Sequence, residues 1–526
     1  MNSAWNLLTG TATKYLLLGV NIVLGIFLMP YTIHHLGTTE YGLWMLVASM
    51  TSYFQLLDLG YGNGLVRHVA DADARGNTTL VNQILSTFAI VYAGLGAASA
   101  VAVAAMIVWV VPHFPKLLPS QISLARFVLA MIGIRIAIGF PMTVFGAATT
   151  ARQRFALNNL VATVIALLNG AATFALLALG YRVRAVVTAT TVMALLGYVA
   201  YAWTAKIAFP ELRLRASAFS GALVRDVTAF SLYVFLIDIA IQIGFNLDNV
   251  VVGAALGTSA VAVYAVTLRL ADTQRQVSCQ FNTLMFPVVV RYDAANDPAA
   301  LKLMLIDGTR LSLTLVCGVT VCLMGFASPL IARWMGPGFE ASVLPLQVLA
   351  LTGVVLVGQG PLGSILMGTG RHRLVAFASL GEAVANLILS VLLVRRFGLL
   401  GVAVGTGVPV FIANLFILAP AACRQLRVGI LAFARTVAVG PLVGALVAAL
   451  TGSALRDALP PQSIAAILAE GALVGIVYLA AVWSIGFDRA VRERYSAFAR
   501  QLLLSVRHRG RSFPDAAAAR AQTPAA

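Results

Sequence analysis

The sequence predicts an all-α integral membrane protein with about 14 transmembrane helices. Of its 526 residues, 60% are hydrophobic and only 10% are charged, whereas soluble domains are about 45–50% apolar and about 25% charged. The mean hydropathy of +0.90 agrees. Because an ordinary core cannot bury so many apolar side chains, lipid must be the solvent for most of the chain. This composition excludes a cytosolic enzyme, a secreted module and a disordered scaffold.

Fourteen apolar stretches approach the length of roughly 20 residues that one bilayer crossing needs. They cover residues 14–33, 41–61, 82–111, 123–150, 157–179, 185–206, 227–250, 259–286, 304–327, 342–366, 373–394, 398–419, 430–452 and 463–486. The first stretch is long enough to cross the membrane and to remain in the protein, unlike a cleaved signal sequence. Short linkers leave no room for an extramembranous domain, and we expect the basic tail, residues 487–526, to be disordered.

Basic residues fall unequally on the two sides of this topology. With a cytoplasmic N-terminus, the inner loops hold fifteen Lys and Arg against seven outside, and the tail adds eight arginines. Because cytoplasmic loops carry an excess of basic residues, both termini are expected inside. The same rule accounts for the net charge of +17 without a nucleic-acid partner. The four cysteines show no metal-ligand spacing, so no metal is expected.

Three sequence matches at nearly one offset predict an internal duplication. The pairs are Leu36-Gly37-Thr38-Thr39 with Leu256-Gly257-Thr258-Ser259, Arg152-Gln153-Arg154 with Arg371-His372-Arg373, and Gly180 with Gly398. Repeats of six helices face the same way in the membrane, related by an axis along its normal. The predicted parts are a lobe (1–206), a cytoplasmic linker (207–226), a second lobe (227–419), two extra helices (430–486) and the tail (487–526).

Two of these motifs support a family resemblance over about residues 1–430. The run Leu36-Gly37, Glu40-Tyr41-Gly42-Leu43-Trp44, followed by Leu57-Asp58-Leu59-Gly60, resembles the N-terminal motif of Wzx-type oligosaccharide flippases. So does Gly257 with Tyr264 before a polar span. These flippases form the polysaccharide-transporter branch of the multidrug/oligosaccharidyl-lipid/polysaccharide (MOP) flippase superfamily.

The resemblance implies a function for the whole chain. It implies a flippase that moves a polyprenyl-pyrophosphate-linked oligosaccharide across the bacterial inner membrane by alternating access. The product would serve surface polysaccharide synthesis, as O-antigen, capsule or exopolysaccharide. The polyprenyl chain would stay in lipid, against spans thirteen and fourteen. Implied partners are the lipid-linked substrate, membrane lipids, a polysaccharide polymerase and chain-length proteins. No cofactor is expected, and proton or sodium coupling is left open.

Span eight carries a polar stripe that points to an aqueous cavity. Residues within about 120° on one helical face are Arg269, Asp272, Thr273, Gln276, Cys279, Gln280 and Thr283. Charged groups at this depth need a cavity or a partner. We predict that Arg269, Arg275, Gln276 and Gln280 bind phosphate or sugar. An intrahelical pair between Arg269 and Asp272 is the alternative.

Three further residues are predicted to meet the substrate. Arg135 lies too deep in span four to reach the interface, so it either pairs with a carboxylate or binds an anionic ligand. Lys14 and Asn21 are one heptad apart on span one. Lys14 could meet a phosphate entering from the inner leaflet, or simply anchor the helix by its charge.

Acidic residues within spans are the candidates for ion coupling. Asp238 shares a face of span seven with Gln242, Asn246 and Asn249, while Asp248 sits off to one side. A carboxylate in low-dielectric surroundings can take up a proton or cation as a cavity opens. Asp272 and Glu382 are the other candidates. Each could instead be a structural partner of a buried arginine or amide.

The segment Asp58, Gly60, Gly62 and Gly64 is predicted to be a hinge or gate at the inner end of span two. No strand precedes these glycines, so they are not a dinucleotide-binding loop. No enzyme motif is present, neither a phosphate-binding loop nor HExxH nor GxSxG. The alternatives are a lipid II-type flippase, a cation-coupled drug exporter of the same superfamily, and a membrane polysaccharide polymerase.

Overall fold

The computed structural model describes residues 3–280, 282 and 285–507, apart from the side chains of 229–246 and of some residues near both ends. All regular structure in these residues is helical. The first seven helices are α1 (Ser3–Ser52), α2 (Tyr61–Ala74), α3 (Thr78–Ala105), α4 (Val111–His113), α5 (Pro119–Ala151), α6 (Phe155–Ala178) and α7 (Val183–Ala208). A 3₁₀ segment, Tyr53–Asp58, joins α1 to α2.

The second half of the chain is also helical. It contains α8 (Gly221–Leu256), α9 (Thr258–Ser278), α10 (Met285–Ala294), α11 (Pro298–Trp334), α12 (Val343–Gly358), α13 (Gly360–Gly368), α14 (His372–Ile412), α15 (Ala419–Gln425), α16 (Ile430–Ala458), α17 (Ile464–Ala481) and α18 (Arg489–Arg507). A π-helical stretch, Ala413–Leu418, joins α14 to α15.

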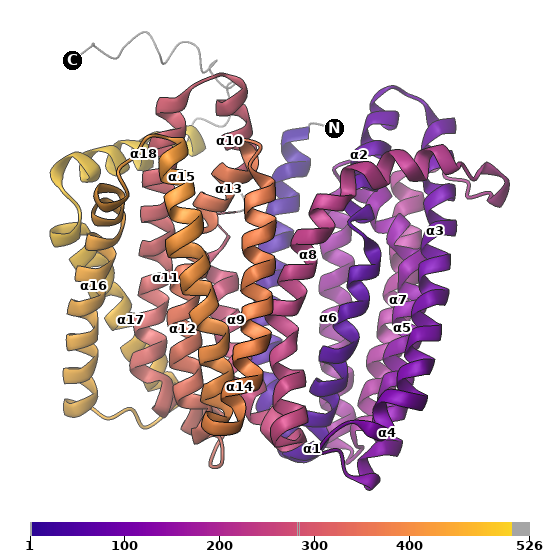
Figure 1. Ribbon diagram of the computed structural model, residues 1–526, viewed down its shortest axis with the longest axis horizontal. Coiled ribbons are helices and arrows are strands. Elements are labelled where there is room, and N and C mark those ends of the chain that lie inside the picture. The colour runs from indigo at the N-terminus through magenta and orange to yellow at the C-terminus, as the bar shows by residue number, and fades with distance from the viewer. Residues whose placement is uncertain (1–2, 281, 283–284, 508–526) are drawn as a thin grey trace.

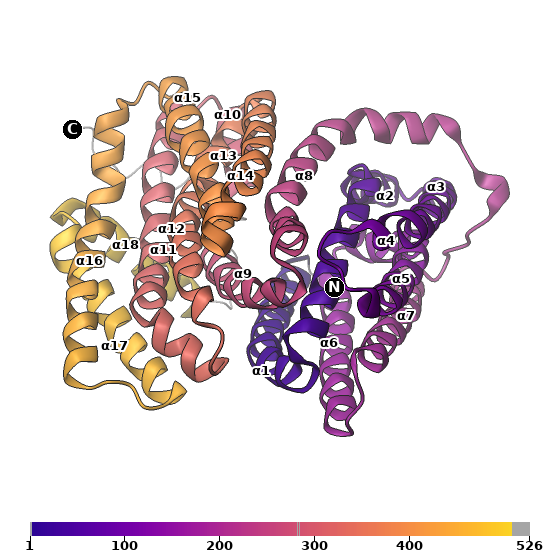
Figure 2. The ribbon, with the colours of Figure 1, turned by 60° about the horizontal axis from the view of Figure 1, so that its bottom comes forward.

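The helices form two groups, with α8 between them (Figure 1). We call α1–α7 the N-lobe and α8–α15 the C-lobe. Figure 2, turned to bring the lower end forward, shows α16 and α17 on the side of the C-lobe away from the N-lobe. There they pack against α11. Helices α8 and α14 pack together, as do α1 and α9, so the two lobes meet along α1, α8 and α9.

Ten helical stretches of the described residues are long and apolar enough to cross a membrane. Two of them contain a sharp turn, at Gly37 in α1 (φ 77°) and at Gly398 in α14 (φ 57°), so each holds two predicted spans. Glycine adopts such positive φ angles without the steric penalty of a Cβ. Helices α8 and α9 are not among the ten. The multi-pass helical architecture is confirmed, and the number fourteen stays a prediction.

Similar backbone turns recur about 220 residues apart. Gly257, between α8 and α9, has φ 91° and ψ 175°, close to the values of 77° and 163° at Gly37. Gly76 and Asn296 both have positive φ, 68° and 52°. The residue after each of these two caps the next helix, because Asn77 accepts a bond from the Leu80 N–H and Asp297 from the Ala300 N–H.

The lobes touch backbone to backbone beside the turns at Gly37 and Gly257. A Cβ on Gly42 would lie 1.8 Å from the Thr258 carbonyl oxygen, so only glycine fits this crossing of α1 and α9. The Thr39 and Ser259 hydroxyls are 3.1 Å apart, and the Gln121 amide donates to the Thr258 hydroxyl. Small residues allow this kind of close helix crossing within a membrane.

Three sequence expectations about segments differ from the structure. Span eight was predicted to run through 259–286, but α9 ends at Ser278. Beyond it, the Asn282 side chain donates to the Val357 carbonyl and accepts from the Ser312 hydroxyl, which holds the chain off the helical path. The predicted linker 207–226 is shorter, because α7 continues to Ala208 and α8 begins at Gly221.

The tail is not wholly disordered, because residues 489–507 form α18. Asp488 accepts a bond from the Val491 N–H and so caps the helix. Val491 and Tyr495 pack with Phe487 against the apolar cluster around Tyr478. The composition of the tail does not indicate that Val491 and Tyr495 pack against this cluster.

Candidate functional site

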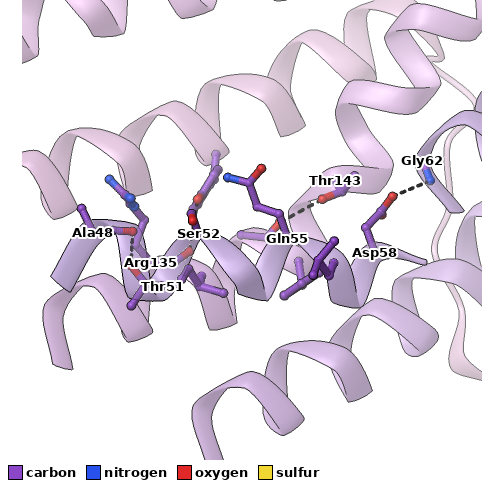
Figure 3. A pocket seen from close by; sticks show the side chains of 13 residues that line it. Ala48, Thr51, Ser52, Gln55, Asp58, Gly62, Arg135 and Thr143 are labelled. Atoms are coloured by element: carbon purple, nitrogen blue, oxygen red, sulfur yellow. Dashed lines mark hydrogen bonds between the residues drawn. The ribbon is translucent and has the colours of Figure 1, made fainter. Parts of the chain in front are cut away.

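A polar cavity of about 800 Å³ lies inside the N-lobe. Its walls come from the part of α1 that follows the turn at Gly37, and from the 3₁₀ segment, α2, α5 and α7. The lining residues are Ala48, Thr51, Ser52, Gln55, Leu56, Asp58, Gly62, Arg135, Ile136, Gly139, Phe140, Thr143 and Tyr198. In Figure 3, Arg135 lies near Ala48 and Thr51, whereas Asp58 is at the other end of the row. The predicted residues Arg135, Asp58 and Gly62 therefore share one cavity.

Arg135 is the cationic group of this cavity. It projects from α5, whose backbone is fixed to α7 by a bond of 3.1 Å from the Tyr198 hydroxyl to the Arg135 carbonyl. Among the side chains that the structure describes, Arg135 forms no ion pair. Of the two readings left by the sequence, this arrangement favours a guanidinium that is available to an anionic ligand.

Asp58 is held firmly at the other end. Its carboxylate accepts bonds from the Tyr92 hydroxyl at 2.6 Å and from the Gly62 N–H at 3.2 Å. The chain reverses just after it, where Leu59 and Gly60 have φ angles of 52° and 73°. Leucine rarely adopts this left-handed conformation, so the turn stores some strain. Gly60 thus precedes α2, and Gly64 is buried within it.

Arg269 and Asn21 meet at a different place, the seam between α1 and α9. The Arg269 guanidinium donates to the Asn21 carbonyl at 2.6 Å. It lies directly on Gly25, where a Cβ would be only 1.5 Å from the nearest guanidinium nitrogen. Its buried Nε has no partner among the described residues. Lys14 is exposed on α1. These residues do not line the N-lobe cavity.

The other polar residues of α9 lie on the C-lobe side. Asp272 pairs with Arg275 at 3.0 Å, so the intrahelical partner expected to be Arg269 is Arg275 instead. This pair borders a small cavity of about 50 Å³ that also reaches Asp248 and Thr406. Near the end of α9, the Gln280 amide donates to the Gln276 carbonyl. Thr283, the last residue of the predicted stripe, lies outside the described residues.

Asp248, which the helical projection placed to one side of the Asp238 face, is the central acidic residue of this cavity. It is only 2% exposed. The Tyr264 hydroxyl donates to it at 2.8 Å and the Thr406 hydroxyl at 2.9 Å. It therefore joins α8, α9 and α14 inside the C-lobe. The signal that could have found it is the pair of polar residues Asp248-Asn249 near the end of an otherwise apolar segment.

The Asn386 amide and the Ser390 hydroxyl extend this cluster along α14. Asn386 Oδ1 lies 3.4 Å from the Thr406 hydroxyl and accepts a bond of 2.8 Å from the Ser390 hydroxyl. Glu382, one turn before Asn386, instead lies beside Asn414. The side chain of Asp238, the first candidate for ion coupling, lies outside the described residues. The C-lobe thus gathers several oxygen atoms around one buried carboxylate.

The model of the polysaccharide biosynthesis protein family matches residues 7–293. The chain belongs to this family. It is 21% identical over 464 residues to the uncharacterized membrane protein EpsK of Bacillus subtilis, covering 87% of this chain and 91% of the relative. It is 24% identical over 160 residues to Agl15 of Haloferax volcanii, a probable low-salt glycan biosynthesis flippase, covering 30% and 34%.

Solved structures show which fold this member of the polysaccharide biosynthesis protein family has. The lipid II flippase MurJ in an inward closed conformation is similar with a TM-score of 0.69 at 13% identity, over 94% of this chain and 99% of MurJ. An inward-facing multidrug resistance MATE family transporter of the MOP superfamily gives 0.66 at 15% identity, over 79% and 96%. These likenesses show that the chain has the fold of these transporters, and the expected relationship to the MOP superfamily stays a prediction.

Proposed function

We propose that this protein is a flippase that moves a polyprenyl-pyrophosphate-linked oligosaccharide from the inner to the outer leaflet of the bacterial inner membrane. The observation that carries the proposal is the N-lobe cavity of about 800 Å³. Sugar hydroxyls and phosphates cannot cross hydrocarbon without hydrogen-bond partners. The cavity offers a guanidinium, an amide and several hydroxyls within a lobe made of apolar helices. Family membership in polysaccharide biosynthesis agrees with this cargo.

In this proposal the N-lobe receives the head group. Arg135 binds the pyrophosphate, because a guanidinium offers paired donors to phosphate oxygens. Gln55, Thr51 and Thr143 bind the sugars. Arg269 holds the α1–α9 seam closed through the Asn21 carbonyl until the substrate enters.

The polyprenyl chain needs an apolar surface during transit. A cavity of about 290 Å³ between α11, α12, α16 and the π-helical stretch is lined mainly by apolar side chains, among them Leu313, Phe433 and Leu442. We assign the lipid chain to it, consistent with the expected role of the helices after residue 430. The polyprenyl chain and the head group of the substrate then occupy different parts of the protein.

Transport follows alternating access by rocking of the two lobes. The matched turns at Gly37 and Gly257 support a duplication of six helices. Fourteen spans, with both termini cytoplasmic, remain part of the proposal. The protein then passes its product to a polysaccharide polymerase and chain-length proteins, and does no chemistry itself.

We assign ion coupling to Asp248 rather than to Asp238. A buried carboxylate is costly without a neutralising proton or cation, and Asp248 forms no ion pair among the described side chains. The oxygens of Asp248, Thr406 and Asn386 are the ligands that hard cations such as sodium prefer. The Asp272–Arg275 pair beside them keeps the rest of this cavity neutral.

Lipid analysis of a deletion strain tests the proposed function. Polyprenyl-pyrophosphate glycans are measured by mass spectrometry, surface polysaccharide is assayed in parallel, and the leaflet of the pool is probed in the same samples. An inward-facing pool of single repeat units with loss of surface polymer is the expected result. An outward-facing pool would indicate a polymerase. An unchanged pool with normal surface polymer would exclude a polysaccharide cargo and direct the search to drugs or lipid II.

A further inference from the structure

One short segment lines the N-lobe cavity and also packs against α8, the helix that carries Asp248. The chain leaves the α-helical conformation at Tyr53 and follows a 3₁₀ helix to Asp58. It then passes the left-handed residues Leu59 and Gly60 and enters α2. A 3₁₀ stretch that interrupts a helical path often marks a hinge. We therefore consider what each end of Tyr53–Asp58 contacts.

At its first end, the segment is joined to α8 across the lobe interface. The Asn249 amide donates to the Ser49 hydroxyl at 2.8 Å, and both residues are at least nine-tenths buried. Ser49 is one helical turn before Tyr53. Asn249 directly follows Asp248, and neighbouring residues of a helix point about 100° apart. Asp248 of α8 therefore belongs to the C-lobe cluster, while the next residue, Asn249, binds α1 of the N-lobe.

The Tyr53 hydroxyl lies on the segment that packs against α8, the helix of this carboxylate, and it makes no hydrogen bond among the described residues. It is buried, and the Asn249 Oδ1 atom likewise has no hydrogen-bond partner there. The hydroxyl nevertheless lies near enough to Asp248 to be affected by its charge. A buried hydroxyl without a partner costs about 1–3 kcal/mol. Such a cost is tolerated where the group finds its partner in another state of the protein.

At its second end, the segment forms part of the wall of the N-lobe cavity. Gln55 and Asp58 both line this cavity, together with Ser52 just before the segment. Asp58 is fixed by Tyr92 and by the first turn of α2. A shift of the 3₁₀ segment would therefore change the positions of the polar groups offered to the head group.

We propose that Tyr53 and Asn249 are positioning residues that couple the cation at Asp248 to the N-lobe cavity through the segment Tyr53–Asp58. A bound cation satisfies the carboxylate and leaves the Tyr53 hydroxyl without a partner. When the cation leaves, this hydroxyl donates to Asp248, and the 3₁₀ segment moves toward α8 together with Gln55 and Asp58. Asn249 keeps the two helices in register through Ser49. This inference rests on the cation site that we assign to Asp248.

Distance measurements between spin labels test the coupling. Cys279, Cys317, Cys322 and Cys423 are first replaced by serine. Labels are then placed by Arg75→Cys and Ala295→Cys, which are exposed and lie in corresponding loops of the two lobes. The purified full chain in lipid nanodiscs is measured with sodium chloride, with choline chloride, and at two pH values. We expect a distance change on adding sodium or protons in the parent protein.

Tyr53→Phe and Asn249→Ala should lose this distance change while still binding the cation, measured as protection of the protein against heating. Tyr53→Phe removes only a hydroxyl without a partner, so it should fold normally. Tyr478→Phe and Asn159→Ala are the matched controls. They delete a buried hydroxyl on α17 and a half-buried amide within the N-lobe, neither of them on a helix of the Asp248 cluster, and should respond like the parent.

The variants separate the two proposals. If Asp248→Asn removes the distance change but both Tyr53→Phe and Asn249→Ala retain it, the coupling inference is wrong and the cation site stands. If Asp248→Asn retains both the distance change and the cation protection, the cation site is wrong and the coupling inference fails with it. A parent protein that responds to neither sodium nor pH would overturn both.

Discussion

The polar groups of the two lobes are arranged in opposite ways. The N-lobe has a cavity of about 800 Å³, and its guanidinium at Arg135 pairs with no described carboxylate. The C-lobe has a cavity of about 50 Å³, and its carboxylate at Asp248 already accepts two hydroxyl bonds. A wide cavity with a guanidinium outside any described ion pair suits a large and variable head group, whereas a tight oxygen cluster suits a proton or a small cation. The difference assigns the head group of the cargo to the N-lobe and the driving force to the C-lobe.

The strongest test of this division is the loss of Arg135. A charge-assisted hydrogen bond contributes about 1.5–3 kcal/mol, which is about a tenfold to hundredfold change in rate if the bond is made only during transit. We expect Arg135→Ala to reduce flipping of a lipid-linked glycan in proteoliposomes by that factor. Arg126→Ala is the control, because Arg126 lies on the same helix but is exposed and does not line the cavity. Equal activity of the two variants would remove the N-lobe cavity from the mechanism.

Asp248→Asn tests the other half of the comparison. Asparagine fills the same space and can still accept a bond from the Tyr264 or Thr406 hydroxyl, but it carries no charge to hold a cation. We expect flipping to slow about tenfold and to lose its dependence on sodium or pH. The measurement is the flipping rate across a series of sodium concentrations and pH values. A variant that keeps the parent's ion dependence would show that Asp248 is not the coupling residue.

Gly25→Ala should produce a smaller effect at the seam between the lobes. The added methyl group would occupy the space of the Arg269 guanidinium, so the bond to the Asn21 carbonyl could not form. One such bond is worth about 1 kcal/mol, or about fivefold in an equilibrium. We expect the cross-linking yield between cysteines on α1 and α9 to fall by that factor. Gly19→Ala is the control, since a Cβ there meets nothing within 4 Å.

The unfolding temperatures of two arginine variants should distinguish the ionic clusters of the two lobes. In the C-lobe, Arg310 is 8% exposed and pairs with Asp307, which also pairs with Arg494 of α18. In the N-lobe, Arg152 is 25% exposed and pairs with Asp73 at 2.9 Å and with Glu211 at 2.5 Å. Removing a buried member of an ionic cluster costs about 3–5 kcal/mol, whereas each partly exposed pair is worth about 1 kcal/mol. Arg310→Ala should therefore lower the unfolding temperature more than Arg152→Ala, and the reverse order would show that the C-lobe cluster is well solvated.

Much of the fold could be predicted because it depends on local chemistry. Apolar stretches of bilayer length and the glycines at 37, 180, 257 and 398 are visible in the sequence, and all four glycines adopt positive φ. Arg135 and Asp58, which line the N-lobe cavity, could be singled out because a charge within an apolar stretch is costly. These inferences needed no knowledge of neighbouring helices.

The rest depends on contacts between distant segments. Asp248 was set aside because the helical face was drawn through Asp238, and only packing against Tyr264 and Thr406 shows which face of α8 matters. The polar stripe of α9 was expected to line one cavity. The structure instead turns Arg269 toward α1, and Asp272 and Arg275 toward the C-lobe. A helical projection shows which residues share a face but not which neighbour each end of that face meets.

The connection between the lobes has a consequence for how tightly they must bind each other. Residues 209–220, with one short 3₁₀ turn at Ala216–Ala218, are all that separates α7 from α8. A short tether holds two modules at an effective concentration in roughly the mM range. An affinity that would be far too weak to hold two separate proteins together therefore suffices here. The interface can combine apolar packing between α1 and the C-lobe with a few bonds such as Thr39 to Ser259 and Asn249 to Ser49, which can break and re-form in every cycle.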